Sequence, residues 1–223
     1  MKSRASIALH LNDAQRQRLV ALQQAFARAC NALAPKVRET RCWNRVALHH
    51  MAYKQLREQF PELGSQMVCN AIYSVSRSAR LVYQHRASPF NVQRLGERAL
   101  PLLQFADSSP VYFDRHTLSL KEGVLSLFTL DGRMRFDVRM DSDVEALLHE
   151  GRLREVVLAR RGEGFELSFA FSQGEDEHAA EALEADANGP QWPEYLLVTP
   201  DDPNAPRLAP ARMGEAPRAA PHD

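Results

Sequence analysis

The stretch Ser6–Gln15, SIALHLNDAQ, contains the transition that decides the fold. Its first six residues alternate between apolar and other side chains, as in a short β-strand with one buried face. Asn12 or Asp13 then offers a side-chain oxygen that can cap the first turn of a helix. The sequence therefore predicts a strand over Ser6–Leu11 that is followed directly by a helix.

Three apolar stripes with helical spacing follow this strand. We expect the first helix to end at Pro35 and the second to end at Pro61, because proline interrupts the helical hydrogen bonds. A shorter fourth helix is expected between Asn91 and Leu100. The stripes are Leu19, Leu22, Phe26, Ala29 and Leu33; Trp43, Val46, Tyr53, Leu56 and Phe60; and Val68, Ile72, Val75, Ala79 and Val82. Opposite the third stripe, a polar face is expected at Asn70, Ser74, Arg77, Arg80 and Gln84.

After Pro101 the apolar period changes from helical spacing to alternation, which is typical of strands. Asp131-Gly132 lies between two alternating runs and is a strong hairpin signal. Phe165, Leu167, Phe169 and Phe171 are expected to face inward. We predict five or six short antiparallel strands, and closing them into a barrel would remove exposed edges. The predicted strands include 118–120, 124–130, 134–138, 153–160 and 165–171.

The first strand has no neighbour in sequence, so later strands must satisfy its edges. This order predicts an α+β fold in which residues 13–100, a bundle of three to four helices, are inserted after the first strand of an antiparallel β-barrel. The barrel would comprise residues 1–12 and 101–172. Residues 173–223 are acidic and hold eight of the thirteen prolines, so we expect a mostly disordered tail in which only Trp192–Val198 is ordered.

The overall composition indicates a globular protein. Of the 223 residues, 44% are hydrophobic and 25% are charged, which excludes a disordered or fibrous chain. No run approaches the roughly 20 apolar residues of a membrane span, and the first residues lack a signal peptide, so a cytoplasmic protein is expected. Cys30, Cys42 and Cys69 have no metal-binding spacing and are expected to be reduced and buried.

The formal net charge of zero conceals a strong polarity along the chain. Residues 1–105 carry 16 Lys and Arg against 5 Asp and Glu, a net charge of +11. Residues 106–172 carry −3 and residues 173–223 carry −8. All but four of the 28 cations are arginine, whose guanidinium suits contacts to phosphate and bases. A GC-rich genome explains much of this arginine preference, but not the scarcity of acids in the first 105 residues.

Signals of small-molecule catalysis are absent from the sequence. It contains no dinucleotide-binding, P-loop, serine-hydrolase or zinc-protease motif, so no catalytic residue, metal or cofactor is predicted. His49 and His50 are adjacent on a helix and point about 100° apart, so they do not chelate one ion together. His49 is expected to pack in an apolar stripe. Residues 114–116 are expected to form a solvated turn.

Three stretches carry a resemblance to a known family. They are LHLNDAQRQRLVALQQAFARACNALA (Leu9–Ala34), the run from Ala47 to Gln84, and SPVYFDRHTLSLKEGVLSLFTLDGRMRFDV (Ser109–Val138). Together they resemble the N-terminal half of transposon-encoded TnpB proteins and compact type V CRISPR effectors. The resemblance covers about residues 5–172. It implies an oligonucleotide-binding-like wedge barrel with an inserted recognition lobe that holds a guide RNA and the start of an RNA–DNA heteroduplex.

The chain departs from that family after the barrel. The family continues with a RuvC-like nuclease domain that supplies separated carboxylates and a four-cysteine zinc module. Here the nearest counterpart is Tyr195–Pro200 followed by Asp201 and Asp202. Two-metal hydrolysis needs carboxylates from several elements, so autonomous nuclease activity is not expected.

The candidate nucleic-acid contacts are cations interleaved with aromatic residues, a composition typical of single-strand or heteroduplex binding. Trp43 and Tyr53, however, also lie on a predicted core stripe. Asn70, Arg77 and Arg80 are the first candidates. The full set is Arg38, Arg41, Arg45, Lys54, Arg57, Asn70, Arg77, Arg80, Arg86, Arg133 and Arg135.

These observations leave several functions open. The first is a nuclease-lacking, TnpB-like protein that binds a guide or structured RNA, with target DNA as a further candidate ligand. It would act by occupancy or as the recognition subunit of a complex with a separate RuvC-like nuclease. The second is a helical protein–protein adaptor, and the third is a decaying transposon fragment. The acidic tail either keeps the protein soluble or competes with nucleic acid for the basic lobe.

Overall fold

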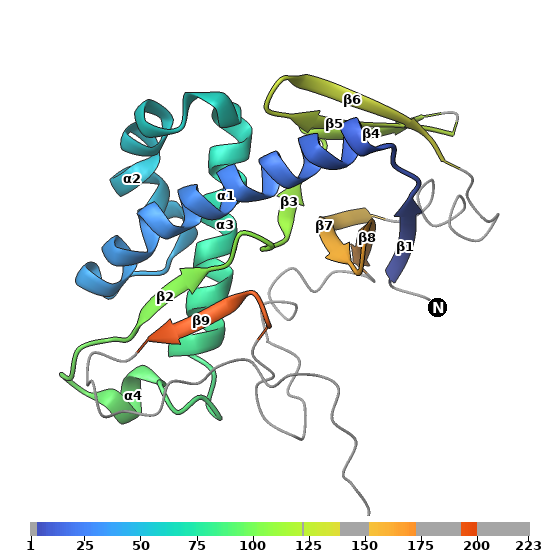
Figure 1. Cartoon of the computed structure of the whole chain (residues 1–223). Coiled ribbons are helices and arrows are strands. Elements are labelled where there is room, and N and C mark those ends of the chain that lie inside the picture. The colour runs from blue at the N-terminus through green and yellow to red at the C-terminus, as the bar shows by residue number, and fades with distance from the viewer. Residues whose placement is uncertain (1–3, 122, 139–151, 173–192, 200–223) are drawn as a thin grey trace, which may run out of the picture.

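The computed structural model describes residues 4–121, 123–138, 152–172 and 193–199 (Figure 1). These residues form an α+β fold, as the sequence predicts. The helices are α1 Asp13–Thr40, α2 Arg45–Gln59, η1 Pro61–Leu63, α3 Gly64–Tyr83 and α4 Val92–Leu95. The strands are β1 Arg4–Leu9, β2 Leu102–Phe105, β3 Val111–Phe113, β4 Leu118–Lys121, β5 Val124–Thr129, β6 Gly132–Asp137, β7 Arg152–Arg161, β8 Gly164–Ser172 and β9 Leu196–Thr199.

The strands form three antiparallel sheets. Their orders are β1-β8-β7-β3, β4-β5-β6 and β2-β9, and these pairings do not close the barrel expected from the sequence. β1 pairs with β8 along its whole length, so the lone first strand finds its partner late in the chain. The hairpin predicted at Asp131-Gly132 is confirmed as β5-β6, and the predicted strands 153–160 and 165–171 pair as β7 and β8.

Helix α1 begins as predicted but does not end as predicted. Asn12 and Gln15 form a capping box, in which each side chain accepts a hydrogen bond from the other residue's backbone N–H. The helix then runs through Pro35 to Thr40, so the expected end at Pro35 is wrong. Ala34 and Val37 are almost fully buried on either side of the exposed proline, and their packing outweighs the lost hydrogen bond.

Helix α3 packs against α1, α2 and β3, and α1 crosses in front of it in Figure 1. The predicted third stripe is confirmed, because all five of its residues are buried. The second stripe is partly wrong: Leu48, Ala52 and Leu56 are buried, whereas Val46 is 63% exposed. The buried apolar residues of the helices and the sheets form one hydrophobic cluster. The predicted helical block, residues 13–100, therefore shares its core with the strands.

The β2-β9 sheet is fixed to α1 by one amide side chain. Asn31 Nδ2 donates to the Phe105 carbonyl at 2.9 Å, and Asn31 Oδ1 accepts from the Phe105 N–H at 2.7 Å. Asn31 thus satisfies the backbone of β2 on the side opposite β9, as a neighbouring strand would. β9 lies largely within Trp192–Val198, the segment of the acidic tail that was expected to be ordered. Residues 173–192 and 200–223, including Asp201 and Asp202, lie outside the described residues.

Replacing Asn31 by alanine is expected to lower the free energy of unfolding by about 1–3 kcal/mol, because two polar backbone groups of Phe105 lose their partner. Denaturant titration measures this loss. Gln17→Ala, at an exposed position of the same helix, is the control. Equal effects of the two substitutions would contradict the role given to Asn31.

The remaining predictions for this part of the chain have different outcomes. Arg133 and Arg135, two of the candidate nucleic-acid contacts, are exposed on β6. Cys30 is buried, and burial raises the pKa of its thiol to about 12. Cys42 and Cys69 are half-buried, so the expectation that all three cysteines are buried is wrong. None of the described helices has the length and apolar character to cross a membrane.

Candidate nucleic-acid interface

One side of α3 carries a row of polar and aromatic side chains that packing leaves partly exposed. Its members recur at helical spacing and form what we call the α3 strip: Gln66, Cys69, Tyr73, Arg77 and Arg80. This strip replaces the polar face predicted from the sequence. Asn70 is 5% exposed and Ser74 is 3% exposed, so the expectation of an open polar face at these residues is wrong.

The centre of the α3 strip is a network around one carboxylate. Tyr73 Oη donates to Glu155 Oε1 at 2.9 Å, and Arg77 Nη1 lies 3.3 Å from the same oxygen. Arg77 also lies over the ring of Tyr112, with 6.0 Å between its Cζ and the ring centroid. The rings of Tyr73 and Tyr112 meet edge to face at 5.4 Å. The network thereby joins α3 to β3 and β7.

Burial and charge together keep Tyr73 protonated. Removal of its hydroxyl from water, reinforced by the negative charge of Glu155, raises the pKa of Tyr73 to about 12. The phenol therefore remains a hydrogen-bond donor to Glu155 at neutral pH. Glu155 in turn offsets part of the positive charge of Arg77, whose side chain is 44% exposed.

Helix α2 adds two cations beside the α3 strip. The Cζ of Arg45 lies 5.2 Å from the centroid of the Tyr73 ring, within the range of a cation–π contact. Burial raises the pKa of the Cys69 thiol, and among the nearby charges Arg45 and Arg57 lower this pKa while Asp114 raises it. Nη1 of Arg57 is buried and has no hydrogen-bond partner among the described residues. Arg45 and Arg57 of α2 thus adjoin different parts of the α3 strip.

The strip continues toward the β3–β4 turn. Gln66 Nε2 donates to Asp114 Oδ2, and the other Asp114 oxygen accepts from the backbone of His116 and Thr117. Arg133 Nη2 then donates to the His116 carbonyl at 2.6 Å. Residues 114–116 are therefore a structured turn that links the α3 strip to β6.

The other predicted contacts lie elsewhere or serve the fold. Arg41 donates to the carbonyls of Gly96 and Arg98, at 2.6 Å and 3.0 Å, and so holds that loop to the end of α1. Arg38 lies in the last turn of α1, close enough for its charge to act on Tyr83. Lys54, Arg86 and Arg135 are exposed, and Arg80 belongs to the α3 strip.

The sequence alone did not reveal Glu155, Tyr112 or Gln66 as neighbours of the predicted arginines. Glu155 and Tyr112 come from strands that are distant in sequence, and only the packing of α3 beside β3 brings them to Arg77. Gln66, Cys69 and Tyr73 do share helical spacing with Arg77 and Arg80. This spacing could have identified Gln66, Cys69 and Tyr73 as members of the exposed face in place of Asn70 and Ser74.

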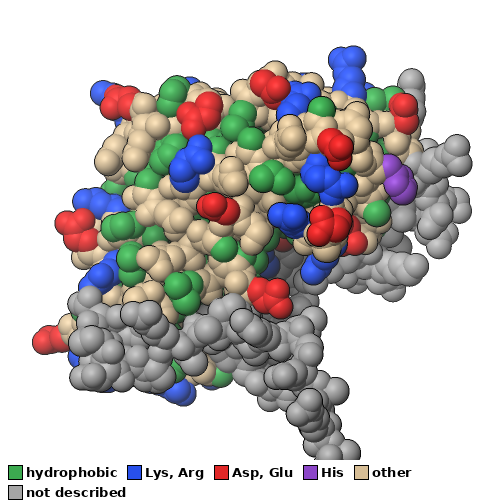
Figure 2. Space-filling model, viewed as in Figure 1, with side chains coloured by type: hydrophobic (Ala, Val, Ile, Leu, Met, Phe, Trp, Pro, Cys, Tyr) green, Lys and Arg blue, Asp and Glu red, His purple; other side chains and the backbone are tan. Residues whose placement is uncertain are grey.

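The charge polarity along the sequence does not produce a uniformly basic surface. On the face shown in Figure 2, Lys and Arg side chains of the described residues are interspersed with Asp and Glu. The α3 strip and α2 contribute Arg45, Arg57, Arg77 and Arg80 to one region, where the carboxylates of Asp114 and Glu155 also lie. Comparisons of this chain with protein-family models and with curated proteins find no match.

Proposed function

We propose that this chain binds RNA through the α3 strip and the adjoining arginines of α2, without cleaving it. The observation that carries the proposal is that Arg45 and Arg77 lie beside the partly exposed ring of Tyr73, while Arg57 adds a further cation on the Cys69 side of the α3 strip. Guanidinium groups that follow a row of phosphates, with an aromatic ring for base stacking, are the common elements of single-strand recognition. Arginine outnumbers lysine at this site, which favours bidentate phosphate contact.

The resemblance to TnpB-like proteins adds a more specific version of this proposal. In that version the bound RNA is a guide or structured RNA, and target DNA is read by base pairing to it. In this version, the three separate sheets of this chain would take the place that the closed wedge barrel has in the family. The protein would act by occupying its target or as the recognition subunit of a complex whose nuclease is a separate chain.

RNA that co-purifies with the protein tests this function. We expect RNA to co-purify with the protein, to be protected from ribonuclease and to be released at high salt. Sequencing should show that this RNA consists of a limited set of sequences. A protein that purifies free of RNA, and that binds no added single-stranded RNA at low salt, would contradict the proposal.

Glu155→Gln is a substitution that we expect to raise the affinity for RNA. Removal of this carboxylate leaves the charge of Arg77 without its acidic partner, so we expect RNA to bind about 3-fold or more tightly at low salt. The free energy of unfolding should fall by about 1 kcal/mol, because a charge-assisted hydrogen bond becomes a neutral one. Fluorescence anisotropy and denaturant titration measure the two effects.

Glu163→Gln is the matched control, because this exposed residue of the β7–β8 turn carries the same charge away from the α3 strip. Equal gains in affinity from both substitutions would show that only the net charge matters. That result would remove Arg77 from the proposed interface.

A further inference from the structure

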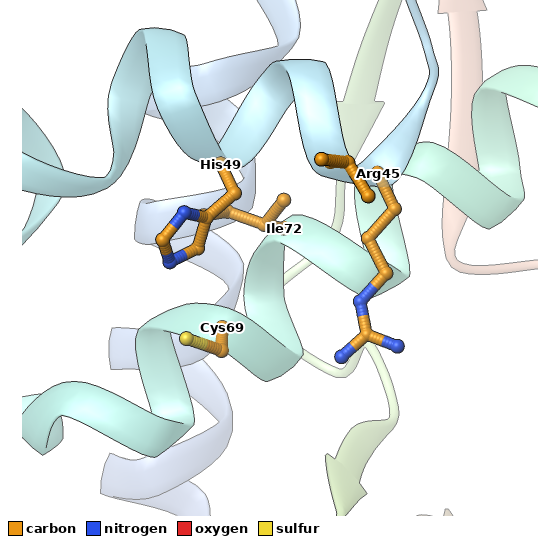
Figure 3. A pocket seen from close by; sticks show the side chains of 5 residues that line it. Arg45, His49, Cys69 and Ile72 are labelled. Atoms are coloured by element: carbon orange, nitrogen blue, oxygen red, sulfur yellow. The ribbon is translucent and has the colours of Figure 1, made fainter.

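A small hollow lies beside the α3 strip, between the start of α2 and the middle of α3 (Figure 3). Its volume is about 250 Å³. Pockets for drug-sized ligands hold roughly 300–1,000 Å³, so this hollow suits a single ring system and not a whole cofactor. It is lined by Arg45, Val46 and His49 from α2 and by Cys69 and Ile72 from α3.

The apolar part of the hollow is open to solvent. Val46 is 63% exposed, the largest value among the large hydrophobic side chains of the described residues, whereas Ile72 is only 1% exposed. An apolar side chain held in water loses the stabilisation that burial brings. A flat, largely apolar group that covered Val46 would recover it.

Rings and cations surround the same hollow. His49 stacks on Tyr53 with 4.5 Å between the ring centroids and 20° between the planes. The side chain of Arg45 extends from α2 toward α3 (Figure 3). Its guanidinium lies over the ring of Tyr73. A ring that entered between His49 and Arg45 would meet an apolar wall, and the phosphate attached to it would remain near Arg45.

We infer that this hollow takes one unstacked base of a single-stranded RNA whose phosphates lie along the α3 strip. The inference rests on the proposed function. Bases within a duplex are paired and stacked, and extruding one of them costs free energy. The chain should therefore bind single-stranded RNA more tightly than a duplex of the same sequence.

A short single-stranded RNA of mixed sequence that carries 2-aminopurine tests this inference, because the fluorescence of 2-aminopurine reports base stacking. Its complement converts the same probe into a duplex. The informative variant is Val46→Ser, which removes apolar surface without changing any charge. Met51→Ser is the matched control, since Met51 is a 40% exposed residue of the same helix that does not line the hollow.

Val46→Ser is expected to weaken binding of the single strand about 5-fold or more and to reduce the change in 2-aminopurine fluorescence. Met51→Ser should leave both unchanged, and neither variant should alter duplex binding. If the unmodified chain binds the single strand but Val46→Ser has no more effect than Met51→Ser, the base site is refuted and the proposed function stands. If the unmodified chain binds neither probe, the proposed function fails and the inference fails with it.

Discussion

The triple substitution of Arg45, Arg57 and Arg77 by glutamine is expected to lower the affinity for single-stranded RNA about 10- to 100-fold at low salt. Arg45 and Arg77 lie beside Tyr73, and Arg57 lies on the Cys69 side of the same strip. Hydrogen bonds that involve charged groups are individually strong, and each lost phosphate contact also removes the release of a counterion. Fluorescence anisotropy with a labelled RNA measures the change.

The control variant removes three positive charges at positions outside the α3 strip. Arg28, Arg94 and Arg160 are exposed cations outside the α3 strip, and their replacement by glutamine changes the net charge equally. We expect this second triple variant to retain most of the affinity. A similar loss in both triple variants would show that binding follows the overall charge and not the interface described here.

Phe169→Ala is expected to lower the free energy of unfolding by about 3–5 kcal/mol. Phe169 is 1% exposed and lies in register with Ala5 on β1 and with Val156 on β7. Because helices and sheets share one hydrophobic cluster, this loss should also move the unfolding transition of the helical block. Trp43 reports on that block, since its ring lies 5.6 Å from the ring of Tyr83.

Trp43 fluorescence, measured in a Trp192→Phe background, shows whether the helical block unfolds together with the sheets. A shift of the Trp43 transition by Phe169→Ala, coincident with the change in circular dichroism, is the expected result. Ser168→Ala, on the half-exposed face of the same strand, should cause a much smaller shift. A Trp43 transition that Phe169→Ala leaves in place would mean that the helical block folds independently of the sheets.

Much of the fold was visible in the sequence because it depends on local periodicity. The alternation around Asp131-Gly132 predicted β5 and β6, and the inward positions Phe165, Leu167, Phe169 and Phe171 are all buried. The isolation of the first strand required a later partner, and β8 is that partner. Each of these predictions needs only spacing and the cost of an unsatisfied strand edge.

What the sequence did not reveal depends on tertiary packing. α3 is covered on most sides by α1, α2 and β3, so its polar residues Asn70 and Ser74 are buried where an amphipathic helix would have exposed them. Burial of Ala34 and Val37 maintains α1 through Pro35. The network of Glu155 with Tyr73 and Arg77 joins α3 to β7, and no local pattern indicates such a contact.

The salt dependence of RNA binding tests the central claim most directly. When a protein releases counterions from a single strand, the logarithm of its affinity falls linearly with the logarithm of salt concentration, with a slope of about −0.7 per phosphate contacted. We predict a steep slope for the unmodified chain and a slope smaller by about 2 when Arg45, Arg57 and Arg77 are all glutamine. An affinity that does not respond to salt, or an equal slope in the two proteins, would contradict binding through this interface.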